Sequence, residues 1–308
     1  MRDSRKTLVC ALAAGCLVAA VWFAASAGWG PFRPKDRDTL QPRDGRPRIA
    51  SLAPSVTEIL FAIGAQDLVV GVTDVCDYPP EAKRFPSIGN FGRPNTEALL
   101  AARPTHVIAD GMDPAIDAGY LSKFGIKLVD LRIGNVREVL AAILEIGRIA
   151  GKNDGAKGLV ESMQAELDRM SAESDSIPPG SRPRVFVEVW NSPLTTAGKG
   201  SFIDDIISLA GGVNVARDLD KPYAPVSAEK IVEWNPDVII LGYMTEAHVN
   251  RDDIGERIGW SGIAAVKNGR IVRDVPPDYL FRPGPRLVAA VKMVAERLKG
   301  VCSSSGSE

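Results

Sequence analysis

One pattern occurs twice in this chain, first as Asn95-Thr-Glu97-Ala-Leu-Leu-Ala-Ala-Arg-Pro104-Thr-His-Val-Ile108 and, 132 positions later, as Ser227-Ala-Glu229-Lys-Ile-Val-Glu-Trp-Asn-Pro236-Asp-Val-Ile-Ile240. Each copy reads as an N-cap residue, an acid in the first helical turn, a short helix, a proline break and an apolar strand. Ordinary helix construction also accounts for either copy, because the cap supplies an acceptor and the acid suits the helix dipole. Two copies in the same order predict two similar α/β lobes, each with one glutamate at a helix start.

Strand-like runs alternate with helical patterns around the two copies. Strands are expected at residues 48–52, 69–73, 106–109, 127–131, 184–190 and 270–275. This alternation predicts a mostly parallel sheet that is covered on both faces. Ser55-Val-Thr-Glu58 fits a capping box and predicts a helix that ends at Gly64. A second helix is expected to begin at a Ser201 cap, and a final one to run from about residue 285 to 299.

The middle of the chain is helical by its pattern. Residues 135–174 show helical periodicity, with a break at 151–155, and the apolar stripe Leu159, Met163, Leu167 and Met170 follows that break. The fold class expected is therefore α/β, with two Rossmann-like lobes joined by one long rigid helix. The predicted segments are an N-terminal lobe at 48–134, a helical segment at 135–180, a C-terminal lobe at 181–299 and a disordered tail at 300–308. A ligand is expected in the crevice between the lobes.

The first 27 residues carry an export signal rather than part of the fold. A positive head, Met1 to Lys6, precedes 22 uncharged, largely apolar residues from Leu8 to Trp29. Three interpretations stay open: a signal peptide cleaved after Ala27, an uncleaved membrane anchor, and a lipoprotein site at Cys16. All three place the folded part outside the cytoplasm, in the periplasm or anchored on the outer face of the cytoplasmic membrane. Residues 28–47, rich in proline and charge, read as a flexible tether.

Composition excludes several classes of function. The 308 residues have a net charge of −1, and the basic residues are scattered, so no nucleic-acid partner is expected. Two histidines make a three-histidine metal site impossible, and no catalytic or nucleotide-binding motif is present. We therefore expect no enzyme, no catalytic residue, no metal site and no cofactor. Outside the leader only Cys76 and Cys302 remain, and the sequence leaves open whether they form a disulfide.

Several loops carry residues that a binding crevice would use. Phe91 precedes the first copy of the pattern, Trp190 ends a strand, and Tyr223 lies between prolines before the second copy. Asp278 and Arg282 precede the last helix. Aromatic side chains on proline-stiffened loops can face a flat or bulky ligand at little ordering cost, although each can also pack beneath its own loop.

These features together resemble a known family. Arg48-Ile-Ala-Ser-Leu-Ala-Pro-Ser-Val-Thr-Glu-Ile-Leu-Phe-Ala-Ile-Gly64, Gly71-Val-Thr-Asp-Val-Cys-Asp-Tyr-Pro-Pro80 and Pro94-Asn-Thr-Glu97 are similar to the cobalamin and ferric-siderophore family of ABC-transporter substrate-binding proteins, over roughly residues 46–299. The similarity is greatest to the cobalamin-binding branch. It implies two lobes bridged by a rigid helix and a ligand clamped between them.

The resemblance also assigns roles to residues. It implies that Phe91 and Tyr223 stand at ligand-stacking aromatic positions, and that Asp278 and Arg282 lie near the corrin amides. It implies a monomer that docks through Glu97 and Glu229 to arginines of the membrane permease. Two departures leave the ligand open: Val75 replaces a ligand-contacting tyrosine, and Ala210 replaces a cysteine of a second-lobe disulfide. Cobalamin or a related corrinoid is the expected ligand. The alternatives are a ferric siderophore or haem, for which Arg93, Arg282 and Arg286 would supply positive charge, and, from another class, an exported α/β enzyme.

Overall fold

The computed structural model describes residues 45–111, 117–243 and 254–302, and one compact unit begins at Arg46. The leader, most of the tether and residues 303–308 lie outside the described residues, so the predictions made for them remain predictions. No helix in the described ranges is both long and apolar enough to cross a membrane.

The N-terminal lobe is built on a four-stranded parallel sheet. Its strands, in spatial order, are β2 (Val69–Val72), β1 (Ile49–Ser51), β5 (His106–Ala109) and β6 (Lys127–Asp130). Successive residues belong to opposite faces: Ile49 joins a large core with helix α3 (Pro54–Ala62), whereas Ala50 joins a smaller core with α4 (Thr96–Ala101) and α5 (Ala118–Ser122). This alternation is the two-residue repeat of a strand covered on both faces. A short hairpin of β3 (Gly89–Asn90) and β4 (Arg93–Pro94) leads into α4.

The C-terminal lobe is built on a mixed sheet. Its strands, in spatial order, are β10 (Tyr223–Pro225), β8 (Leu194–Ala197), β7 (Arg184–Asn191), β11 (Val238–Leu241) and β12 (Ile271–Val272), with β9 (Val213–Asn214) paired to β7. Strands β7, β11 and β12 pair in parallel, β8 pairs antiparallel with β7, and β10 pairs antiparallel with β8. Phe186 and Ile239 pack into a core with Trp234 of α9 (Ala228–Trp234) and with Trp260. Helices α10 (Ala264–Lys267) and α11 (Pro277–Phe281) complete this lobe.

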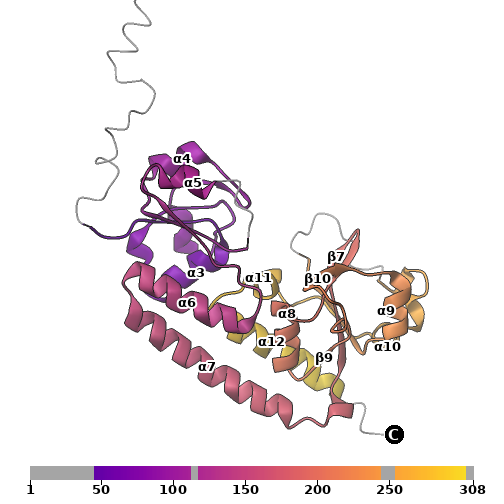
Figure 1. The fold of residues 1–308 in the computed structure, drawn as a ribbon. Helices are drawn as coiled ribbons and strands as arrows, with labels where there is room; N and C mark the ends of the chain where they lie inside the picture. The colour runs from indigo at the N-terminus through magenta and orange to yellow at the C-terminus, as the bar shows by residue number, and fades with distance from the viewer. Residues whose placement is uncertain (1–44, 112–116, 244–253, 303–308) are drawn as a thin grey trace, which may run out of the picture. The chain divides into compact units, whose positions relative to one another are not determined.

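Helices α6 (Val136–Ala150) and α7 (Asn153–Asp175) link the lobes, as Figure 1 shows. Asn135 caps α6, and Gly151 ends it with a left-handed backbone conformation at φ 65°. Helix α7 packs along α6 and reaches α8 (Phe202–Leu209) and α12 (Leu287–Cys302) of the second lobe. Across this junction the carboxylate of Asp205 on α8 accepts a 2.9 Å hydrogen bond from the backbone N–H of Val136 on α6.

One hydrophobic core runs through both lobes. It contains residues of β1 and α3 from the first lobe, of α6 and α7 between them, and of β7, α8 and α12 from the second. Met163, Leu167 and Met170 of α7 are buried in it, as the apolar stripe predicts. Because both lobes bury side chains against the same helices, separating them would expose apolar surface. The predicted fold class, two α/β lobes joined by a long helix, is confirmed.

Several local predictions are confirmed and others are wrong. Both copies of the repeated pattern fold as expected, with Asn95 and Ser227 accepting hydrogen bonds at the starts of α4 and α9. The capping box is wrong, because Pro54 takes the first helical position of α3 and makes Ala53 the N-cap. The strand expected at 270–275 is limited to Ile271–Val272, and Tyr223 begins a strand rather than lying in a loop. Helix α12 continues to Cys302, so residues 300–302 are helical instead of part of a tail.

Candidate functional site

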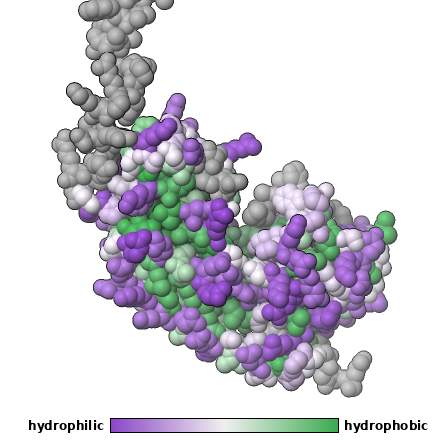
Figure 2. Space-filling view, in the orientation of Figure 1, coloured by the Kyte–Doolittle hydropathy of each residue, from purple (hydrophilic) through white to green (hydrophobic). Residues whose placement is uncertain are grey.

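Polar loops from the two lobes meet where their parallel strands end. The loop after β2 carries Asp77, and α11, which follows β12, carries Asp278 and is succeeded by Arg282. Helix α11 lies between the lobes in Figure 1, and Figure 2 shows the surface notched between them. Open α/β sheets bind ligands beyond the carboxyl ends of their strands. This interlobe notch is therefore the candidate site.

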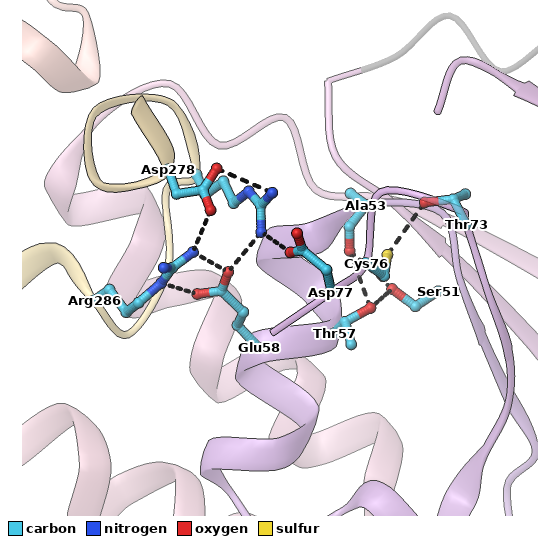
Figure 3. Close-up of polar contacts among 10 residues, drawn as sticks. Ser51, Ala53, Thr57, Glu58, Thr73, Cys76, Asp77, Asp278 and Arg286 are labelled. Carbon is cyan, nitrogen blue, oxygen red and sulfur yellow. Dashed lines mark hydrogen bonds and ion pairs between the residues drawn. The ribbon is translucent and has the colours of Figure 1, made fainter. Parts of the chain in front are cut away.

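Five charged side chains at the notch form one interlobe cluster (Figure 3). Its members are Glu58 and Asp77 from the N-terminal lobe and Asp278, Arg282 and Arg286 from the C-terminal lobe. Arg286 binds Glu58 in a bidentate manner, with Nε to Oε2 at 2.8 Å and Nη2 to Oε1 at 2.6 Å. Arg282 places Nη1 2.6 Å from Asp77 Oδ1 and Nη2 3.0 Å from Asp278 Oδ1. The cluster thus ties residues 58 and 77 to residues more than 200 positions later.

Aromatic rings hold one arginine of the cluster in place. The guanidinium of Arg286 lies 4.5 Å from the ring centroid of Tyr78 and 4.9 Å from that of Tyr279, one tyrosine from each lobe. Cation–π contacts of this kind strengthen when water is excluded. Arg286 is therefore held by an ion pair and by stacking. Its contacts with Glu58 and Tyr78 cross the boundary between the lobes.

The pKa values of two acids of the cluster are shifted in opposite directions. Desolvation raises the pKa of Glu58, which is 3% exposed, and the hydrogen bonds and charge of Arg286 act against that rise. Desolvation also opposes ionisation of Asp77, but the hydrogen bond and charge of Arg282 outweigh it and lower the pKa of Asp77. Asp77 is accordingly the carboxylate that Arg282 keeps ionised at the surface.

Buried hydrogen bonds anchor the loop that carries Asp77 (Figure 3). Cys76, 2% exposed, lies with Sγ 3.1 Å from Thr73 Oγ1, and Thr57 Oγ1 donates to Ser51 Oγ at 2.8 Å. Burial raises the pKa of the Cys76 thiol. Cys76 is a free cysteine in this structure, and the side chain of Cys302, with which the sequence left a disulfide open, lies outside the described part of the chain. The buried thiol helps to fix its neighbour Asp77.

The structure places the predicted ligand residues as follows. Asp278 and Arg282 are joined by an ion pair. Phe91, in the turn between β3 and β4, is 50% exposed, and Trp190 on β7 is half-buried, with Nε1 donating to the carbonyl of Ser192. Tyr223 is 44% exposed, yet desolvation of its hydroxyl raises the pKa of Tyr223 to about 12. Within the described residues these three aromatic rings do not touch one another, so their joint use by a ligand remains a prediction.

Glu97 and Glu229 occupy equivalent places in the two lobes. Each lies in the first turn of its helix, α4 or α9, and each is exposed. A hydrogen bond from its own backbone N–H, with a further one from Ser227, lowers the pKa of Glu229. Two exposed acids in matching positions are available to a partner protein.

Sequence reasoning missed the interlobe role of Glu58. The sequence pattern predicts that Glu58 is half of a capping box, whereas it lies on a helix whose residues 54–60 are all buried. A lone acid within an apolar, buried helix requires a cationic partner, and this signal was available. The sequence does not identify that partner, because no local pattern connects residue 58 to residue 286.

A second buried cluster lies within the C-terminal lobe. Glu188 on β7 is 0% exposed and binds Arg257 through contacts of 2.6 and 2.9 Å, and it also accepts a hydrogen bond from the hydroxyl of Tyr243. Desolvation and this carboxylate raise the pKa of Tyr243. Arg257 stacks 4.6 Å from the centroid of Trp260. Across the described ranges, no group of three or more histidine, cysteine or acidic side chains is arranged to hold a metal ion.

Comparison with known proteins now identifies the class. A family model described as "Periplasmic binding protein" matches residues 49–278. The chain belongs to this family. A lipoprotein of Bacillus subtilis, "Uncharacterized ABC transporter substrate-binding lipoprotein YvrC", is 34% identical over 256 residues, which cover 82% of this chain and 79% of the relative. The chain is thus a substrate-binding protein of the ABC-transporter type.

Two solved structures are similar along almost their whole length. The periplasmic vitamin B12 binding protein BtuF of Vibrio cholerae is 27% identical, with a TM-score of 0.70, covering 82% of this chain and 97% of that one. The periplasmic heme-binding protein RhuT from Roseiflexus sp. RS-1 is 26% identical, with a TM-score of 0.73, covering 84% and 100%. Such relatives are binding proteins for transport rather than enzymes, which supports a non-enzymatic role, and the family with its lipoprotein relative supports export.

Proposed function

We propose that this protein captures cobalamin or a related corrinoid outside the cytoplasm and delivers it to an ABC importer. The observation that carries the proposal is the interlobe cluster, which presents Asp77 and Asp278 at the notch with side chains 42% and 41% exposed. Carboxylates accept hydrogen bonds from amide NH₂ groups, which a corrin carries around its rim. The similarity to a vitamin B12 binding protein supports the same ligand.

A haem or ferric-siderophore ligand is the alternative. The similarity to a heme-binding protein favours it, and Arg282 and Arg286 would be its natural partners. Both arginines are already paired with carboxylates, which leaves less positive charge for an anionic chelate.

A titration separates these ligands. Isothermal calorimetry with cyanocobalamin, cobinamide, haem and ferric siderophores is expected to give a submicromolar Kd for a corrinoid, or about −8 kcal/mol or better. Phe91→Ala and Tyr223→Ala are each expected to weaken that binding by about 1–3 kcal/mol, as aromatic anchors do elsewhere. If haem or a siderophore binds tightly and no corrinoid gives a binding heat, the corrinoid proposal is wrong and the alternative ligand is supported.

Delivery is proposed to use Glu97 and Glu229. An exposed carboxylate can form directional, charge-assisted hydrogen bonds with permease arginines, and one acid per lobe gives two anchoring points. The double variant Glu97→Ala, Glu229→Ala is expected to bind ligand normally yet fail to stimulate uptake into vesicles that contain the cognate permease. Uptake equal to that of the parent would show that these acids merely cap their helices.

A further inference from the structure

The exposed edge of the interlobe cluster is acidic. Asp77 and Asp278 are 42% and 41% exposed, Arg282 and Arg286 are 15% and 12% exposed, and Glu58 is 2% exposed, all measured on side chains. A molecule that enters the notch therefore meets carboxylates before it meets guanidinium groups. Three carboxylates face two guanidinium groups, so the cluster carries a formal net charge of −1.

Both arginines of the cluster are already paired with resident carboxylates. Arg282 directs Nη1 to Asp77 and also approaches Glu58 at 3.6 Å, while its Nη2 binds Asp278. Arg286 uses Nε and Nη2 for Glu58. A ligand carboxylate would add a further negative charge beside three resident carboxylates, which costs affinity through like-charge repulsion. An amide escapes that repulsion and can donate hydrogen bonds to the same oxygens.

We infer that Asp77 is a specificity-determining residue: by pairing with Arg282 across the lobes, it makes the notch select uncharged, amide-bearing ligands over carboxylate-bearing ones. This inference rests on the proposed function of the notch as the ligand site. Asp278 lies four residues before Arg282 and pairs with it within the same lobe. Asp77 comes from the opposite lobe, on a loop that buried Cys76 anchors, so its charge is supplied independently of α11.

The test compares Asp77→Asn with Asp74→Asn. Both variants remove one negative charge from the same loop, but Asp74 is exposed and makes no ion pair within the described ranges, whereas Asp77 contacts Arg282. Asparagine can still accept a hydrogen bond from Arg282, so the fold should persist, and circular dichroism checks this.

The measurement compares binding affinities within two pairs of ligands. The two members of each pair share one macrocycle and differ only in whether side chains are uncharged or carboxylates. The pairs are cyanocobalamin against its monocarboxylic acid, in which one corrin propionamide is hydrolysed, and iron protoporphyrin dimethyl ester against iron protoporphyrin. With the purified full-length chain, the uncharged side-chain form is expected to bind at least about tenfold more tightly than the acid form. Asp77→Asn is expected to reduce that preference by about tenfold, while Asp74→Asn leaves it unchanged.

The outcomes separate this inference from the proposed function. If cyanocobalamin binds but Asp77→Asn keeps the same preference as Asp74→Asn, the corrinoid function stands and the role of Asp77 is wrong. If only the porphyrins bind, the corrinoid function fails. The role of Asp77 is then supported if Asp77→Asn reduces the preference for the dimethyl ester over the acid, and is wrong if that preference is unchanged. A parent protein that prefers the acid form on the macrocycle it binds overturns the inference outright.

Discussion

Two buried glutamates in this molecule use the same chemistry for different purposes. Glu58 and Glu188 are 3% and 0% exposed, and each binds an arginine through two contacts of 2.6–2.9 Å. The arginine of Glu188 is 69 residues away within the same lobe, whereas the arginine of Glu58 is 228 residues away in the other lobe. One pair closes a lobe on itself and the other joins two lobes.

The surroundings of the two arginines differ accordingly. Arg257 stacks on Trp260 of its own lobe, and the Glu188 carboxylate that it binds also accepts a hydrogen bond from the Tyr243 hydroxyl. Arg286 lies between tyrosines from both lobes, and a second arginine and two further acids extend its cluster to the surface. A pair within one lobe contributes to the folding of that lobe, while a pair whose cluster joins both lobes and reaches the notch can also affect what binds there.

The largest effect is expected from Glu188→Ala. This change leaves the Arg257 guanidinium and the Tyr243 hydroxyl without their acceptor, and breaking a buried pair typically costs about 3–5 kcal/mol. The free energy of unfolding, from urea denaturation, measures the loss. Glu233→Ala is the control, because that acid forms an exposed pair with Lys230 and should cost less than about 1 kcal/mol. Equal losses in the two variants would mean that burial of Glu188 does not set its contribution.

A smaller effect, of about 2–3 kcal/mol, is expected from Glu58→Gln. The amide keeps one acceptor for Arg286, and Asp278 Oδ2 lies 3.8 Å from the same guanidinium, so the arginine is not left alone. The tryptophans of the described residues, at 190, 234 and 260, all lie in the C-terminal lobe, whereas far-UV circular dichroism reports on both lobes. Since one core joins the lobes, both signals should shift to lower urea together. A shift in circular dichroism alone would show that the lobes unfold separately.

The sequence was sufficient for features that depend on neighbouring residues. Asn95 and Ser227 cap their helices as predicted, since an N-cap needs only a side-chain acceptor near the next few amides. The error at Ser55 was also local: Pro54 prefers the first helical position, and that preference outweighed the capping-box pattern. The Ser55 hydroxyl is instead used by Asp110, to which it donates at 2.7 Å.

The candidate site was only partly predictable, for a physical reason. The Asp278–Arg282 pair is separated by one helical turn, so its contact follows from spacing. The contacts of Asp77 with Arg282 and of Glu58 with Arg286 depend on how two lobes pack through a shared core. No periodicity in a single sequence indicates how the lobes pack. The ion pairs that join the two lobes are therefore found only in the structure.

The smallest effect concerns acid. Because Arg282 lowers the pKa of Asp77 in the folded protein, the folded state binds fewer protons there than the unfolded chain, whose pKa is near 3.8. The stabilisation from Asp77 should therefore be complete above that value and disappear as the pH falls through the lower folded pKa. Asp77 is 42% exposed, so solvent screening limits the contribution to about 0.5 kcal/mol.

The measurement is the difference in urea midpoint between the parent and Asp77→Asn, followed from pH 5 down to about pH 3. This difference should become smaller as the pH falls. Asp274→Asn, which removes an exposed partner of Arg297, should show a similar sign but a smaller change, because that pair is 59% and 41% exposed and joins no lobes. A difference for Asp77→Asn that stays constant with pH would mean that its carboxylate does not stabilise the junction through Arg282.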